Sequence, residues 1–319
     1  MNSNPHETDP ESLTLAPVTQ PVAATSFFAR HAFPILFLGL LGAAFSPIIV
    51  RLSEVGPIAT AVNRMALPLP LFFALLWLRP QDRIPMKTRT GLHDFWLVVL
   101  SGAFFAADLT LWFSSVMMTS VANASMLSNM TPVFVVLGGW LLFKYRPGPL
   151  LIVGMIVALL GSGVMMLESL ELSGRSVAGD FLAMGASVFF AGYVLTLSRV
   201  RKRVSIMATM AIGGLAATLI LVILAVLFED QIWPSTLDGW LTAASMVVFV
   251  QIGGQMLIAM SLAYVPAGLV ATMFLVSPII SALVAWPLFN ESITLIQVAG
   301  AAVLLAGLEL SRRGTAKKE

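Results

Sequence analysis

Two ionisable side chains lie deep inside mainly apolar stretches of the sequence. Arg64 stands about 10 Å, and Asp108 about 14 Å, from the end of its stretch if each forms a helix rising about 1.5 Å per residue. Charges at such depths in a membrane are costly and usually mark a substrate or ion pathway. Three interpretations stay open: an ion pair that fixes packing, contact of Arg64 with an anionic substrate group, and exchange of a coupling proton at Asp108.

Uncharged polar residues form a second group. Ser125 and Asn129 are four residues apart, as are Gln251 and Gln255, so each pair shares one helix face. An amide in hydrocarbon needs a partner, either a neighbouring helix or the contents of a polar pocket. We favour a pocket that hydrogen-bonds a small metabolite, with Trp112, one turn after Asp108, available for stacking. The candidate substrate-binding residues are Arg64, Asp108, Trp112, Asn129, Gln251 and Gln255.

Other chemistry finds little support in the residue types. The chain has no cysteine, and its histidines, His6, His31 and His93, lie in the N-terminal tail or at a predicted span end. The sequence therefore predicts no metal site, no catalytic triad and no cofactor. An intramembrane lipid-modifying enzyme, the alternative from a different class, would need acids or histidines clustered near one interface. We expect a protein that is not an enzyme.

The composition predicts the kind of element that must position these residues. Of 319 residues, 58% are hydrophobic and only 11% are charged, whereas soluble chains carry about 25% charged residues. So little charge cannot cover a soluble globule, and the net charge of +2 gives no reason to expect a nucleic-acid partner. The chain is predicted to be an all-α polytopic membrane protein whose main surroundings are a lipid bilayer.

Ten transmembrane helices are predicted, because a span needs about 20 mostly apolar residues. The predicted spans are residues 33–52, 57–78, 95–117, 120–143, 149–167, 178–199, 206–228, 238–263, 266–289 and 293–311. Residues 1–32 are predicted to form a disordered cytoplasmic tail, 168–177 an outer loop and 312–319 a basic cytoplasmic tail.

Lysine and arginine positions predict the orientation. With both termini in the cytoplasm, fifteen of the 18 basic residues lie on the cytoplasmic side. Outside lie only Arg51 and Arg175, and Arg64 is in the membrane. The positive-inside rule therefore favours cytoplasmic termini in a bacterial-type inner (plasma) membrane.

The sequence also contains an internal repeat. A shift of 146 residues aligns the stretch beginning at Pro132 with the one beginning at Pro278, including Trp140 with Trp286 and two glycines with two glycines. Spans four and five thus match spans nine and ten, so residues 33–167 and 178–311 form two five-helix repeats. Five is odd, so the repeats must have inverted orientations, as in secondary transporters that work by alternating access.

Short motifs in both repeats carry a family resemblance. They are Thr-Ser-Val-Ala-Asn-Ala-Ser-Met-Leu at residues 119–127, Thr-Pro-Val-Phe at 131–134, Ala-Gly-Leu-Val-Ala at 267–271, Ser-Pro-Ile at 277–279 and Phe-Asn-Glu at 289–291. With its two five-helix repeats, the chain resembles the drug/metabolite transporter (DMT) superfamily, specifically its EamA-type members, over residues 33–311. One departure is residues 143–146, Phe-Lys-Tyr-Arg, where such members often carry a Gly-Glu pair.

These observations predict a secondary transporter of small organic metabolites. The resemblance alone implies amino acids or related compounds as substrates and export as the direction. Uptake or exchange of a bulkier solute, such as a nucleoside-, vitamin- or nucleotide-sugar-like compound, stays an alternative. The sequence favours neither a monomer nor a dimer.

Overall fold

The computed structural model describes residues 26–119, 121–144, 147–166, 177–277, 279–280, 283 and 294–316. Several sequence-based predictions fall outside these residues: most of the disordered tail, the outer loop at 168–176, Pro278 and Glu291. Within the described ranges the regular structure is helical throughout, comprising α-helices with short 3₁₀ and π segments.

The described helices fall into two groups on either side of residues 167–176. The earlier group comprises α1 (Ser26–Arg30), α2 (Ala32–Ala44), α3 (Ser46–Arg51), α4 (Pro57–Ala66), α5 (Leu69–Leu78), η1 (Pro80–Asp82), α6 (Arg89–Met118), α7 (Val121–Ser128), α8 (Thr131–Phe143) and α9 (Pro149–Met166). The later group comprises α10 (Val177–Val200), α11 (Ile206–Ala208), η3 (Thr209–Gly213), α12 (Gly214–Phe228), α13 (Leu237–Ser245), η4 (Met246–Met256), α14 (Leu257–Ser261), α15 (Ala267–Met273), η5 (Phe274–Val276) and α17 (Leu295–Ala316). Of these, η3 and η4 are π-helical, and both belong to the later group.

Seven helical segments of the described chain are long and apolar enough to cross a membrane. They are Ala32–Arg51, Pro57–Leu78, Arg89–Met118, Val177–Val200, Ile206–Phe228, Leu237–Ser261 and Leu295–Gly314. The other three predicted spans correspond to shorter apolar helices at Thr131–Phe143, Pro149–Met165 and Ala267–Val276. The third of these leads into residues that the structure does not describe.

Prolines and N-caps account for the helix boundaries. The predicted span 120–143 is two helices, α7 and α8, because Pro132 lies in the first turn of α8, where its missing N–H is tolerated. Pro47 and Pro70 occupy the same position in α3 and α5. Helix α6 begins six residues before the predicted start, at Arg89, because the Thr88 side chain accepts a hydrogen bond from the Gly91 N–H at 2.9 Å.

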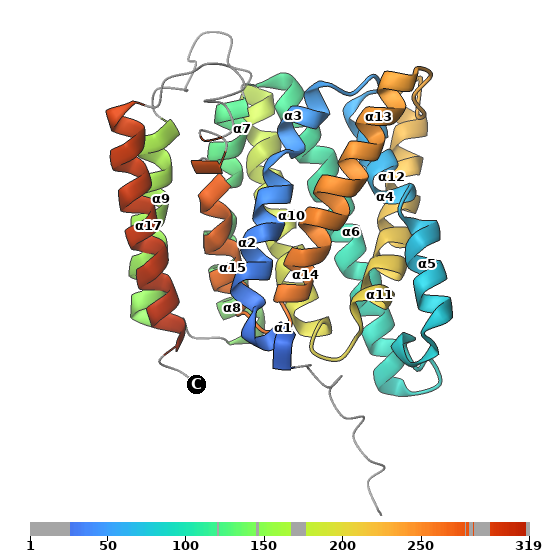
Figure 1. The fold of residues 1–319 in the computed structure, drawn as a ribbon, viewed down its shortest axis with the longest axis horizontal. Helices are drawn as coiled ribbons and strands as arrows, with labels where there is room; N and C mark the ends of the chain where they lie inside the picture. Colours follow the sequence, from blue (N-terminus) through green and yellow to red (C-terminus); the bar gives the residue numbers. More distant parts are fainter. Residues whose placement is uncertain are drawn as a thin grey trace, which may run out of the picture.

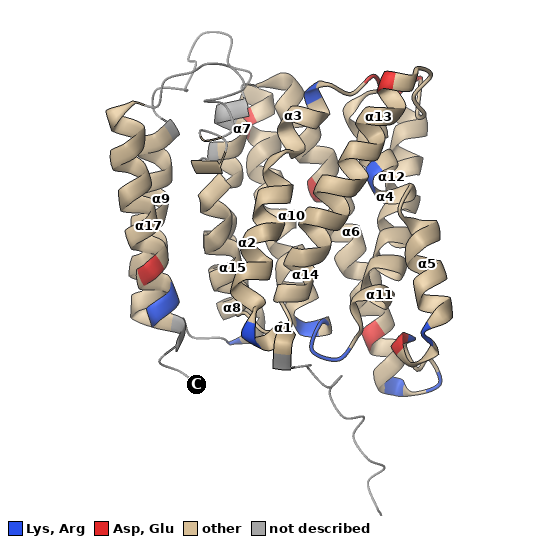
Figure 2. Cartoon of the chain, in the orientation of Figure 1, with Lys and Arg blue, Asp and Glu red and all other residues tan. Residues whose placement is uncertain are grey.

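The helices form one bundle whose charged residues gather at its two ends, with few between them (Figures 1 and 2). One end, termed the basic end, carries α1, the turn after α5 and the turn after α10. There Arg203 donates to the buried carboxylate of Asp94 at 2.5 and 3.1 Å, which joins the turn after α10 to the first turns of α6. The described end of α17 lies at this end as well (Figure 1).

Carboxylates tie the loops of the opposite end to helix N-termini. Glu229, after α12, accepts hydrogen bonds from the backbone N–H groups of Ile58 and Ala59 at 2.8 and 2.6 Å. Glu54 accepts from the backbone N–H groups of Ser235 and Thr236 at 3.0 and 3.1 Å, just before α13. Glu229 thus satisfies N–H groups that α4 leaves unpaired at its start, and Glu54 binds the two residues that immediately precede α13.

Helices α9 and α17 pack side by side at one flank of the bundle (Figure 1). They touch through glycines: a Cβ on Gly154 would stand 2.6 Å from the Gly307 oxygen, and a Cβ on Gly161 would stand 2.8 Å from the Gly300 oxygen. Adding 146 to Gly154 gives Gly300, and subtracting 146 from Gly307 gives Gly161. The repeat offset therefore converts one glycine contact into the other.

Candidate functional site

A cavity of about 160 Å³ lies at the centre of the bundle. Helices of both groups contribute to its walls: α2, α3, α4, α6, α7 and α8 from the earlier group, and α10, η4 and η5 from the later group. This central cavity is lined by a set of polar residues comprising Ser46, Arg64, Asp108, Ser125, Ser128, Asn129, Thr131, Ser187, Gln255 and Ser277.

Helix α6 contributes four residues to the cavity lining. Phe105, Asp108, Leu109 and Trp112 all line the central cavity. Their spacing of i, i+3, i+4 and i+7 places them on one helical face. Asp108 is 9% exposed, and no hydrogen bond or ion pair to its carboxylate occurs within the described part of the chain. The Asp108 carboxylate therefore lines the cavity with no direct partner among the described residues.

Arg64, on α4, is held from two sides. Its Nε donates a hydrogen bond to Oε1 of Gln251 at 3.0 Å, and its guanidinium carbon lies 5.2 Å from the centre of the Phe105 ring. The side chain is 4% exposed. Among the described residues, Arg64 and Asp108 form no ion pair, although each lies in the electric field of the other. Within the described chain, the two terminal nitrogens of Arg64 have no hydrogen-bond partner and are available to a ligand.

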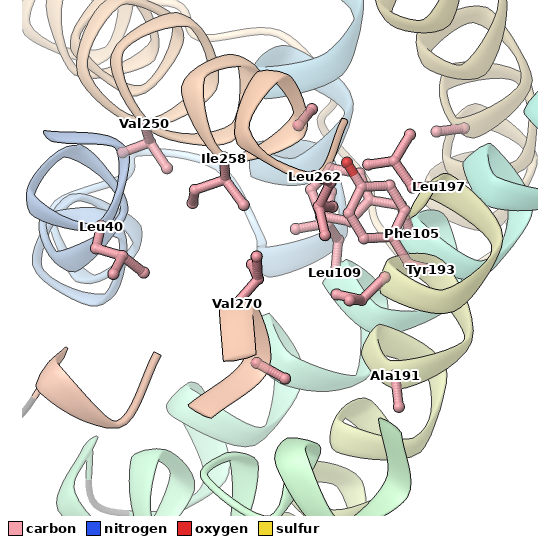
Figure 3. Close-up of a cluster of buried hydrophobic side chains, with 14 of the residues drawn as sticks. Leu40, Phe105, Leu109, Ala191, Tyr193, Leu197, Val250, Ile258, Leu262 and Val270 are labelled. Atoms are coloured by element: carbon pink, nitrogen blue, oxygen red, sulfur yellow. The ribbon is translucent and has the colours of Figure 1, made fainter. Parts of the chain in front are cut away.

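Aromatic rings close the cavity toward the basic end. The Phe105 and Tyr193 rings stack with centroids 4.6 Å apart, and Phe190 stacks on Tyr193 at 5.7 Å. Phe274, on η5, meets Phe190 edge-on at 5.0 Å. The Tyr193 hydroxyl accepts a hydrogen bond from Nε2 of Gln255 at 2.8 Å. Figure 3 shows Phe105 and Tyr193 among buried apolar side chains that include Leu197 and Leu262.

Two hydroxyl groups in the cavity wall have no hydrogen-bond partner in the described chain. They are the Oγ atoms of Ser46, at the start of α3, and Ser128, at the end of α7. Nearby, Asn129 donates a hydrogen bond to the Ser162 hydroxyl at 2.9 Å and so links α7 to α9. A buried hydroxyl without a partner costs about 1–3 kcal/mol, so these two groups favour an occupant that hydrogen-bonds.

The structure brings the six residues predicted from the sequence close together, with one difference in role. Five line the central cavity: Arg64, Asp108, Trp112, Asn129 and Gln255. Gln251 does not line it but holds Arg64 from behind. The side chain of Asn123 lies outside the described residues.

Three phenylalanines and two serines that line the central cavity were not predicted from the sequence. Phe105, Phe190 and Phe274 line the cavity, as do Ser46 and Ser187. Spacing offered a signal for the first, because Phe105 is three residues before Asp108 on the same helix face. Phe190 likewise precedes Tyr193 by three residues. In the described part of the chain, no group of three or more histidine or acidic residues is arranged to hold a metal ion.

The sequence matches the EamA-like transporter family over residues 32–167 and 177–312. It is 26% identical over 219 residues to "Uncharacterized transporter YwfM" of Bacillus subtilis strain 168, covering 66% of this chain and 71% of that protein. It is 25% identical over 230 residues to an "Uncharacterized transporter" of Methanothermobacter thermautotrophicus, covering 70% of this chain and 66% of that protein. These names assign no substrate.

A solved crystal structure has the same fold. It superposes with a TM-score of 0.72 over 91% of this chain and 99% of that chain, at 17% sequence identity. Two family matches together cover most of the chain, and apolar helices cross the bundle from end to end. The chain is therefore a multi-pass membrane protein that belongs to the EamA-like transporter family.

Proposed function

We propose that this protein is a secondary transporter that moves amino acids or closely related small metabolites out of the cell by alternating access. The central cavity is its substrate site. Arg64 binds the substrate carboxylate, and Asp108 binds the substrate ammonium group. Trp112, Asn129 and Gln255 form the remaining contacts, and Gln251 orients Arg64.

The main observation behind this proposal is that one cavity is lined by two oppositely charged residues, Arg64 and Asp108, that do not pair with each other in the described chain. A buried charge without a direct partner is costly and is found in membranes where it serves a substrate. A zwitterion supplies one partner for each charge.

The size of the cavity agrees with a small solute. One water molecule needs roughly 10–15 Å³ of cavity volume. The central cavity, at about 160 Å³, therefore has room for roughly ten water molecules. A solute of about ten non-hydrogen atoms fits this space.

Features of the two repeats support alternating access. Residues 33–167 and 178–311 would be the two halves, and the glycine contacts between α9 and α17 are exchanged by the 146-residue offset. Such an exchange is expected from a pseudo-two-fold axis in the membrane plane, the symmetry of inverted repeats. The basic end would face the cytoplasm, with both chain termini on that side.

Counterflow in proteoliposomes tests the proposal. Vesicles loaded with an unlabelled amino-acid mixture should accumulate labelled amino acids transiently in the presence of the protein. Arg64→Gln and Asp108→Asn should each lower this flux at least tenfold, because each removes the charge that binds one end of the zwitterion. Arg51→Gln, at an exposed position near the opposite end, is the matched control and should keep wild-type flux.

Stability measurements on the same variants separate binding from packing. If Arg64 and Asp108 formed a structural ion pair, removing one charge would cost about 3–5 kcal/mol. We expect both variants to melt within a few degrees of the wild type. Variants that unfold, or that transport amino acids normally, would contradict the proposed substrate site.

A further inference from the structure

A second, smaller cavity of about 20 Å³ lies between the central cavity and the basic end. Its lining includes Ser101, seven residues nearer than Asp108 to the basic start of α6. It also includes Thr209 and Gly213 of η3, which follow the turn at the basic end. This basic-end cavity has room for about one water molecule and is lined by several hydroxyl and amide groups.

One layer of side chains separates the two cavities. Phe105 and Gln255 line both of them. Arg64 lines only the central cavity, whereas Tyr193 and Gln251 line only the basic-end cavity. Each of these five side chains belongs to a residue at most 4% exposed. We call these five residues the separating layer.

Specific contacts hold the separating layer together. Arg64 donates to Gln251 at 3.0 Å, Gln255 donates to Tyr193 at 2.8 Å, and the rings of Phe105 and Tyr193 stack at 4.6 Å. The first and third contacts join the earlier helix group to the later one. If one repeat moves against the other, these two contacts must therefore either break or move with the helices that they join.

Two π-helical segments lie around the separating layer. Gln251 and Gln255 both lie on the π-helical segment η4, and the other π-helical segment of the described chain, η3, lines the basic-end cavity. π-helical turns are rare and are often found at functional sites. Two of them flank the same small cavity.

We propose that the separating layer is the gate between the substrate site and the basic end, and that the basic-end cavity is the next position on the solute path. This inference rests on the proposed transport function. Gln251 and Gln255 are its positioning residues: through their amides they hold Arg64 and Tyr193 across the path.

Thiol accessibility tests the gate, since the natural chain contains no cysteine. Two reporters are made separately, Ser128→Cys in the central cavity and Ser101→Cys in the basic-end cavity. A membrane-impermeant methanethiosulfonate carrying a trimethylammonium group is added from the side of the opposite end. In the otherwise unchanged chain, Ser128→Cys should react and Ser101→Cys should not.

Opening the gate should expose the second reporter. Combining Ser101→Cys with Tyr193→Phe and Gln255→Ala should raise its reaction rate at least tenfold, because the hydrogen bond that closes the path is lost. Thr196→Val is the matched control, since it also removes a hydroxyl from α10, one that bonds only within its own helix at 2.7 Å. It should leave the rate unchanged.

The outcomes are distinct. Equal reaction of Ser101→Cys with and without the gate substitutions overturns the gate, provided that Ser128→Cys reports an intact central cavity in both backgrounds. Loss of the Ser128→Cys reaction identifies a misfolded background, and the single variant Tyr193→Phe, which keeps the ring, then decides in place of the double variant. Amino-acid counterflow is measured independently, so a failed substrate proposal leaves the labelling result interpretable.

Discussion

The sequence places Arg64 inside a membrane span, but the neighbours of its side chain determine what its charge can bind. Its side chain is oriented by Gln251 and Phe105, so its charge points at a defined place in the central cavity. Arginine suits this role because its planar fork can donate through Nε to one partner and through its terminal nitrogens to another. A lysine would lose one of these two functions.

Glu54, at the opposite end, provides a prediction about pH. Hydrogen bonds from the side chains and backbone of Ser235 and Thr236 lower the pKa of Glu54 from 4.5 to about 2. A carboxyl whose pKa falls on folding stabilises the folded state above its unfolded pKa, and this contribution is lost as the pH falls through the folded pKa. The stabilisation should therefore be complete above about pH 4.5 and decline toward pH 2.

Melting temperatures in detergent between pH 7 and pH 3 check this. Glu54→Gln should melt below the wild type at pH 7, and the difference should narrow as the pH falls below about 4.5. Asp230→Asn, which removes another exposed carboxylate of the same end, is measured alongside as the control. A pH-independent difference for Glu54→Gln would assign its effect to shape instead of charge.

At the scale of elements, the contact between α9 and α17 depends on glycine. Both helices are apolar, and lipid is as apolar as their side chains, so their association relies on close packing. A Cβ on Gly161 would stand 2.3 Å from the Leu304 backbone nitrogen, which cannot move aside as a flexible side chain could. By contrast, nothing lies within 4 Å of a Cβ on Gly163, on the same helix.

Gly161→Ala should therefore destabilise the protein, by about 1–3 kcal/mol if the helices separate only slightly. Gly163→Ala is the matched control and should be neutral or slightly stabilising, because alanine favours a helix by up to about 1 kcal/mol over glycine. Thermal melting in the same detergent compares them. Equal melting temperatures for the two variants would show that α9 and α17 do not need this close approach.

At the scale of the whole molecule, charge sets the orientation that we propose. The opposite end carries Glu54, Glu229, Asp230 and Asp238, whereas most of the arginines lie at the basic end, in its turns or at the adjoining helix ends. In intact cells, Asp230→Cys should react with an impermeant maleimide added outside. Lys202→Cys should react only after the membrane is permeabilised. The reverse pattern would invert the proposed topology.

Much of the architecture followed from the sequence because its causes are local. Hydropathy over about 20 residues is a property of one segment, so the apolar helices were predictable without knowledge of their neighbours. The internal repeat likewise needed only two glycines and a tryptophan at matching spacing. The break between α7 and α8 has an equally local cause, because Pro132 removes an N–H donor whatever surrounds it.

The site was predictable only in its residue types. Burial costs marked Arg64, Asp108 and the amides as functional, since each is expensive in hydrocarbon wherever its helix lies. Gln251 and Gln255 share one helix face, so nothing in the sequence distinguished them. Only Gln255 lines the central cavity, whereas Gln251 accepts a hydrogen bond from Arg64, which lies 187 residues earlier in the chain.

Tertiary structure decided these partnerships. It also decided which phenylalanines line the central cavity. Phe105, Phe190 and Phe274 are indistinguishable by hydropathy from phenylalanines on the outer surface of the bundle, such as Phe181 and Phe228. In a membrane the outside of the bundle is as apolar as its core, so hydrophobicity alone does not say which helix faces meet. Close packing between distant segments makes that choice, and it is fixed only when all the helices are in place.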